Sequence, residues 1–207
     1  MQLYAIGYAG RDREKTLEHI EELKEIGVPE PKEVPELYHL NPKLLSESDD
    51  MYVIGNNSSG EVEVVLVYDE SGDISVTVGS DHTDRALETV SIQKSKQLCD
   101  KPIATERIPF NDVKDEWDNL VLKSEVLLNG EWVEYQNGLV SNIISFDAIQ
   151  TYLKEHDVEL KNCIVFCGTV PLVDGFKYGD GFRCSLKSNK LDKEISLEYQ
   201  VKYLKEN

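Results

Sequence analysis

The sequence predicts a mainly β fold of the α+β kind, a mixed β-sandwich or roll with a few peripheral helices. The strongest indication is a pair of β-branched runs, 62–67 and 74–78, separated by a turn that contains Gly72. Asn129-Gly130 indicates a second hairpin, because this dipeptide between apolar runs favours a tight turn. Many short strands separated by turns are typical of sandwiches and barrels.

The chain opens with a predicted strand over residues 3–6 and a helix after it. Asp12 can cap this helix, which we expect to end at Gly27. Apolar residues recur along the helix at helical spacing, so we expect them to form a stripe that faces the core. The stripe consists of Leu17, Ile20, Leu23 and Ile26.

Residues 28–50 are rich in proline, glutamate and serine, and we expect two loops there with a short strand over 37–40 between them, followed by another short strand over 51–54. Beyond the first hairpin, helical segments are predicted over 83–90, 112–118 and 146–152. The last predicted elements are an apolar strand over 163–167 and a closing strand over 195–201.

Three carboxylates are predicted to meet at one end of the first hairpin. Because side chains alternate along a strand, Glu61 and Glu63 point to one face, and Asp81 returns beside them at the end of the second strand. Three converging carboxylates provide the oxygen ligands that a hard divalent cation needs. Taken alone, a Glu-x-Glu pair is more often part of a solvated strand face.

The order Gly60-Glu61-Val62-Glu63, followed about twenty residues later by Asp81-His82-Thr83-Asp84-Arg85, resembles the metal-binding signature of the fumarylacetoacetate hydrolase superfamily. The resemblance implies that Mg²⁺ or Mn²⁺ binds to Glu61, Glu63 and Asp81. It also implies one domain over residues 1–207 with the superfamily's C-terminal fold: 1–59 would hold a strand, a lid helix and loops, and 60–207 the metal-binding β core.

The resemblance implies two further catalytic groups. In the superfamily a His-x-x-Glu dyad on a short helix closes over the metal and activates a water, which corresponds to His19 and Glu22 here. From the spacing alone these two would be a surface pair. A lysine that faces the pocket corresponds to Lys94, and Lys96 is the alternative.

The resemblance also implies a group of substrate-binding residues. The superfamily's late Thr-Gly-Thr-Pro segment binds the substrate carboxylate, and its second threonine corresponds to Thr169. Arg85 and Ser141 are further candidates, together with Lys96.

Composition excludes several classes of function. The formal net charge of −17 and a sequence pI of about 4.6 argue against nucleic acids and anionic membranes as partners, because both require a basic surface. Neither a signal peptide nor a membrane span is indicated, so we expect a cytoplasmic protein. No Cys-x-x-Cys pair occurs, and buried reduced thiols are expected at Cys99, Cys163, Cys167 and Cys184.

The resemblance implies a metal-dependent hydrolase that cleaves a carbon–carbon bond in a small 2-oxo or 2,4-dioxo acid of the acylpyruvate kind. A decarboxylase or isomerase of a related 2-oxo acid is the alternative, because the superfamily uses one site for several reactions. A catalytically silent, metal-stabilised binding protein is the alternative of another class. The resemblance also implies a homodimer, since an apolar strand edge needs cover.

Overall fold

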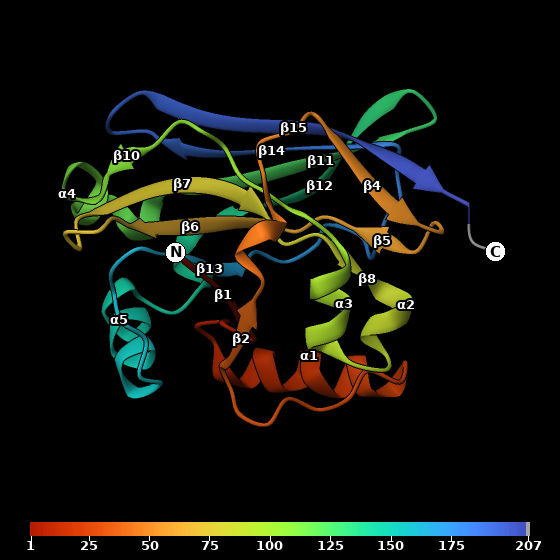
Figure 1. Ribbon diagram of the computed structural model, residues 1–207, viewed down its shortest axis with the longest axis horizontal. Helices are drawn as coiled ribbons and strands as arrows, with labels where there is room; N and C mark the ends of the chain where they lie inside the picture. The colour runs from red at the N-terminus through yellow and green to blue at the C-terminus, as the bar shows by residue number, and fades with distance from the viewer. Residues whose placement is uncertain (206–207) are drawn as a thin grey trace.

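The computed structural model describes residues 1–205, and it consists of two stacked sheets with helices around them (Figure 1). The larger sheet has six strands in the order β10-β7-β6-β13-β1-β2, and the smaller has five in the order β12-β11-β14-β15-β4. This arrangement confirms the predicted mainly β fold. Two separate two-stranded ladders, β3–β9 and β5–β8, lie outside these two sheets.

The strands of the six-stranded sheet are β1 (Gln2–Gly7), β2 (Glu36–Leu40), β6 (Val62–Tyr68), β7 (Ile74–Ser80), β10 (Ile108–Pro109) and β13 (Cys163–Thr169). Those of the five-stranded sheet are β4 (Asp50–Ile54), β11 (Val121–Leu128), β12 (Glu131–Leu139), β14 (Gly181–Ser188) and β15 (Lys193–Leu204). The short ladders contain β3 (Leu45–Ser46), β5 (Ser58–Ser59), β8 (Thr83–Asp84) and β9 (Lys101–Pro102).

The α-helices are α1 (Arg13–Glu25), α2 (Arg85–Glu88), α3 (Ile92–Leu98), α4 (Phe110–Val113) and α5 (Phe146–Glu155). Three 3-10 helices complete the elements: η1 (Pro42–Leu44), η2 (Lys114–Asn119) and η3 (Val140–Asn142). None of the helices that the structure describes is long and apolar enough to cross a membrane.

The six-stranded sheet is buried on both faces, and every residue of β6 is buried. Alternate residues such as Val64 and Leu66 pack in the core between the two sheets. Their neighbours Val65 and Val67 pack in a second cluster, which includes Ile92 of α3 and the half-buried Leu23 of α1. The second face is therefore covered by helices, and α1 lies beneath it in Figure 1.

The first two strands belong to the same sheet as the hairpin. β1 pairs in parallel with β13, and β2 pairs with β1 in the antiparallel direction. Strands β1 and β2 are therefore built into the six-stranded sheet, in which β1 lies between β13 and the edge strand β2, whereas β4 belongs to the five-stranded sheet.

Helix α1 differs from the prediction. Asp12 caps it as expected, by accepting a hydrogen bond from the Lys15 amide. Ile20 is buried, but Leu17 is 46% exposed and Ile26 is 62% exposed, so the prediction that both face the core is wrong. The physical reason is that α1 covers the rim of a cavity, where only a narrow stripe of the helix contacts other residues.

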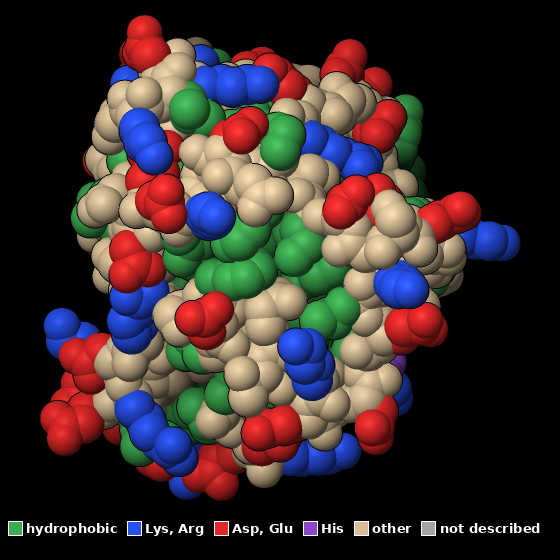
Figure 2. Space-filling view, turned by 90° about the vertical axis from the view of Figure 1, so that its left-hand side faces the viewer, with side chains coloured by type: hydrophobic (Ala, Val, Ile, Leu, Met, Phe, Trp, Pro, Cys, Tyr) green, Lys and Arg blue, Asp and Glu red, His purple; other side chains and the backbone are tan. Residues whose placement is uncertain are grey.

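The face on the left of Figure 1, where α4 and α5 lie, carries hydrophobic side chains near its centre, surrounded by acidic and basic groups (Figure 2). Phe110 of α4 stacks on Phe146 of α5 with ring centroids 3.9 Å apart, and both rings pack against Trp117. This aromatic cluster fixes the two helices at the end of the sandwich, away from the hairpin end that carries the carboxylates.

Candidate active site

The carboxylates of Glu61, Glu63 and Asp81 converge at one end of the β6–β7 hairpin. The register pairs Glu63 with Gly79, and the Asp81 amide donates to the Glu61 carbonyl at 3.0 Å. All three side chains therefore leave the hairpin on its helix-covered face. One oxygen from each lies within 4.8 Å of the others, which is close enough for a single cation.

Burial makes these carboxylates costly to leave uncompensated. Asp81 is 1% exposed and Glu63 is 3% exposed. Burial raises the pKa of Glu63 well above its usual value, and the charge of Asp81 raises it further. Burial also acts to raise the pKa of Asp81, but the charges of Lys96 and Lys101 outweigh it, so that pKa is lowered.

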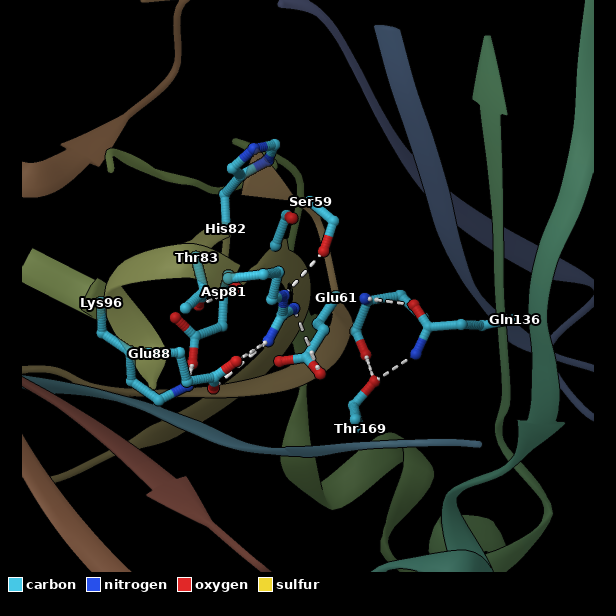
Figure 3. A network of polar contacts seen from close by, with 12 residues as sticks. Ser59, Glu61, Asp81, His82, Thr83, Glu88, Lys96, Gln136 and Thr169 are labelled. Carbon is cyan, nitrogen blue, oxygen red and sulfur yellow. Dashed lines mark hydrogen bonds and ion pairs between the residues drawn. The ribbon is translucent and has the colours of Figure 1, made fainter. Parts of the chain in front are cut away.

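Three cations lie beside the carboxylates, and one of them, Lys96, is labelled next to Asp81 in Figure 3. The Lys96 amine donates to Asp81 Oδ2 at 2.5 Å, and the Lys101 amine lies 3.3 Å from Asp81 Oδ1. Arg85 Nη2 lies 3.4 Å from Glu61 Oε1, and its Nη1 lies 3.1 Å from Glu88 Oε2. The site is therefore a compact network of alternating charges.

Two buried atoms of this network could bind an ion or a ligand. Asp81 Oδ1 and Arg85 Nη2 are buried and make no hydrogen bond to any residue that the structure describes, although each has an oppositely charged atom within 3.4 Å. Such atoms are rare in native proteins unless water, an ion or a ligand satisfies them. The free carboxylate oxygen suits a divalent cation, and the free guanidinium nitrogen suits an anionic oxygen.

A cavity of about 470 Å³ is lined by Glu61 and Glu63, whereas Asp81 is not among its lining residues. Its walls come from the end of β1, from α1, α2 and α3, and from the segment after β13. Tyr8 follows β1 with a φ of 55°, a left-handed conformation that is uncommon for an aromatic residue. Burial raises the pKa of Tyr8 to about 12, so the phenol remains protonated at neutral pH.

Four of the other predicted site residues line the cavity. They are His19, Arg85, Lys96 and Thr169. His19 Nδ1 lies 3.3 Å from Glu22 Oε2, so the dyad is formed, but both side chains are more than half exposed and Glu22 does not line the cavity.

Lys94 and Ser141 lie outside the cavity, so neither is placed where its predicted role requires. Lys94 is exposed on α3, whereas Lys96, two residues later, points to Asp81. Residues two apart on a helix point in roughly opposite directions, so only one of these lysines can face the pocket. Ser141 is part of η3 and is half-buried there.

Thr169 contacts the hairpin instead of offering a free hydroxyl. Its Oγ1 donates to the Val62 carbonyl at 2.7 Å and accepts from Gln136 Nε2 at 2.6 Å. Because a hydroxyl has one proton, this side chain has none left for a substrate. The adjacent Gly168 amide donates to Glu63 Oε2 at 2.8 Å, so the segment orients a candidate metal ligand.

Sequence reasoning missed three charged or polar residues of the site, one of which is Lys101, a fully buried cation beside Asp81. Glu88 lies one helical turn after Arg85, and that spacing was the available signal. Gln136 lies in the middle of β12 and binds groups 33 and 74 positions away in the chain, for which no local pattern exists.

Residues 6–199 match the model of a family described as "Protein of unknown function (DUF2848)". The chain belongs to this family. Among curated protein sequences, none shows a significant match to it.

Solved structures share the fold. A 2-keto-3-deoxy-D-arabinonate dehydratase complexed with magnesium and 2,5-dioxopentanoate matches with a TM-score of 0.69 and 16% identity, over 99% of this chain and 74% of that chain. A 4-oxalocrotonate decarboxylase from Pseudomonas putida G7, complexed with calcium and acetate, matches with a TM-score of 0.60 and 11% identity, over 97% and 76%. Both are members of the fumarylacetoacetate hydrolase superfamily, so the predicted resemblance is confirmed at the level of the fold.

Proposed function

We propose that this protein is a divalent-metal-dependent enzyme that cleaves a carbon–carbon bond in a small 2-oxo or 2,4-dioxo acid by hydrolysis. The observation that carries the proposal is the convergence of the Glu61, Glu63 and Asp81 carboxylates, with an Asp81 oxygen that makes no hydrogen bond to any described residue. The fold neighbours that are complexed with magnesium or calcium are a 2-keto acid dehydratase and a decarboxylase, which supports this substrate class.

Mg²⁺ or Mn²⁺ held by the three carboxylates would withdraw electron density from the oxo and carboxylate oxygens of the substrate. Arg85 would bind the substrate carboxylate through Nη2, the atom that has no hydrogen-bond partner. Lys96 donates to Asp81 and keeps protons available for negative charge that develops on the substrate. The Gly168 amide would keep Glu63 oriented toward the metal, because it donates to Glu63 Oε2 at 2.8 Å.

His19 supplies the proton transfer in this proposal. Its imidazole would take a proton from the attacking water, and Glu22, 3.3 Å away, would hold the ring and stabilise its positive charge. Both residues lie on α1 at the cavity rim, so movement of α1 toward the carboxylates would complete the site.

The test is a panel of acylpyruvates and oxaloacetate, assayed with Mg²⁺ or Mn²⁺ and again after chelation. We expect metal-dependent turnover that Glu61→Ala abolishes and that His19→Ala lowers by about 10²–10⁴-fold, the usual contribution of a general base. Lys96→Ala should remove most activity. Lys94→Ala is the matched control, because that lysine lies outside the cavity.

Decarboxylation is the second candidate, because the side chains of His19 and Glu22 are more than half exposed and a decarboxylase has less need of a base that activates water. Turnover that survives His19→Ala and Glu22→Ala, but not Glu61→Ala, would favour it. Metal binding without any turnover would indicate a metal-stabilised binding protein instead.

A further inference from the structure

The cations of the cavity are already paired with carboxylates of the chain. Arg85 contacts Glu61 and Glu88, and Lys96 and Lys101 both contact Asp81. Lys101 is fully buried and also donates to the carbonyls of His82 and Cys99, at 2.6 and 3.1 Å. Its ammonium is thus held beneath Asp81 and does not line the cavity.

The charge balance of this cluster limits how much negative charge a ligand can bring. The cluster contains four carboxylates, Glu61, Glu63, Asp81 and Glu88, and the three cations described above. A divalent cation on the deprotonated carboxylates would leave one net positive charge. One substrate carboxylate neutralises that charge, and a second would be buried without compensation.

The rest of the cavity offers no buried cation for a second carboxylate. Besides the charged cluster and the polar Thr16, Gln136 and Asn142, its lining includes the apolar side chains of Leu23, Ile92 and Leu172 and the rings of Tyr8 and Phe176. Phe176 covers the guanidinium of Arg85, with its ring centroid 4.5 Å away. These walls favour a carbon-rich remainder on the ligand.

The cations at the rim are exposed and have partners of their own. Lys15 lies 3.8 Å from Asp12 and its side chain is 80% exposed, and His19 lies 3.3 Å from Glu22. Because exposed pairs of this kind are screened by solvent, they stabilise a buried second carboxylate little.

Glu88 supplies the fourth negative charge of the cluster and also limits how Arg85 can bind a ligand. Its side chain is 12% exposed, it lines the cavity, and it occupies Arg85 Nη1, while Ser59 occupies Arg85 Nε at 2.7 Å. Only Nη2 therefore remains for a ligand, so Arg85 cannot form the two-point contact that a fully free guanidinium makes.

We infer that the cavity selects 2-oxo acids with a single carboxylate and an apolar remainder, and that Glu88 rejects dicarboxylates. The inference rests on the proposed function, because it assumes that the oxo acid binds at the metal on Glu61, Glu63 and Asp81. Glu88 would do so in two ways: its negative charge repels a second carboxylate, and its ion pair with Arg85 Nη1 keeps that nitrogen from binding one.

The test compares 2-oxohexanoate with 2-oxoadipate, which share a six-carbon chain and differ by one terminal carboxylate. Calorimetry on the Mn²⁺-loaded full chain gives the dissociation constant of each. We expect 2-oxohexanoate to bind at least about tenfold more tightly, because burying an unpaired charge is costly. Glu88→Gln keeps the shape and removes one negative charge, and should reduce the ratio below about threefold.

The exposed Glu131→Gln, at the first position of β12, is the matched control and should keep the wild-type ratio. Manganese binding is measured first for every variant, so that loss of the metal site is recognised. Equal or tighter binding of 2-oxoadipate by wild type overturns this inference and leaves the proposed function standing. An unchanged ratio in Glu88→Gln overturns the role of Glu88. If manganese binds but neither oxo acid does, the proposed function and this inference both fall.

Discussion

Gln136 is a single buried side chain that joins the two sheets. Its Oε1 accepts from the Val62 amide at 2.9 Å and from Ser124 Oγ at 3.0 Å, and its Nε2 donates to Thr169 and to the Val170 carbonyl. All four hydrogen-bonding positions of the amide are therefore used. Val62 lies between the candidate ligands Glu61 and Glu63, so Gln136 also fixes the backbone that presents them.

Gln136→Met should destabilise the fold by about 3 kcal/mol, because a side chain of similar volume would leave buried amide, carbonyl and hydroxyl groups without partners. Urea unfolding followed by circular dichroism measures the change. Asn137→Met is the control at the next position, which is exposed and bonds only to Glu134 among the described side chains. A loss similar to the control's would contradict the bridging role.

The three candidate ligands could be predicted because strand alternation and hairpin register are local properties. The choice between Lys94 and Lys96 could not, since the rotation of α3 depends on how Ile92 and Ser95 pack in the fold. The orphaned atoms of Asp81 and Arg85 were beyond prediction for the same reason: they arise from side chains that only the folded chain brings together.

Among the elements, helix α1 was predicted in position but misread in packing. The apolar spacing indicated a stripe of four residues, yet the structure buries Thr16 and Ile20 and leaves the ends of the stripe exposed. Thr16 packs against Gly10, where a Cβ would lie 2.3 Å from Thr16 Oγ1 and only glycine therefore fits.

Helix α5, by contrast, buries Ile149 and Leu153 completely.

This difference predicts different opening free energies for the two helices. Amides of α1 should exchange with deuterium faster than those of α5, because α1 has fewer buried apolar contacts. Adding Mn²⁺ and 2-oxohexanoate should slow exchange in α1 several-fold as it closes over the ligand, while α5 serves as the internal control. Mass spectrometry of peptides from both helices measures this. Ligand binding without added protection of α1 would rule out the lid.

At the scale of the whole molecule, the single domain over residues 1–207 and the cytoplasmic location stay predictions. The pairing of β1 with β13 means that a boundary at residue 60 does not separate independent sheets.

The four free, buried cysteines agree with the expectation of reduced thiols. The net charge of −17 also still argues against polyanionic partners, although the cavity's local charges, and not the total, determine what binds there.

The edge of the five-stranded sheet supports the predicted homodimer. β4 is the edge strand, and Tyr52 and Ile54 on its outer face are 59% and 46% exposed. Leu204 of β15 pairs with Ile54 in the register and is 47% exposed. An apolar strand edge of this kind is stabilised by pairing with a second copy across a two-fold axis.

Light scattering should therefore give a mass of twice the 23.5 kDa of one chain. Replacing Ile54 by Lys and Tyr52 by Glu should lower the mass to that of one chain, since charges on an edge strand oppose pairing. Val90→Glu is the control, because Val90 is 71% exposed but lies between α2 and α3, away from β4. A mass of one chain for wild type up to its highest soluble concentration would refute the dimer, whereas a dimer that survives both edge substitutions would place its interface on another surface.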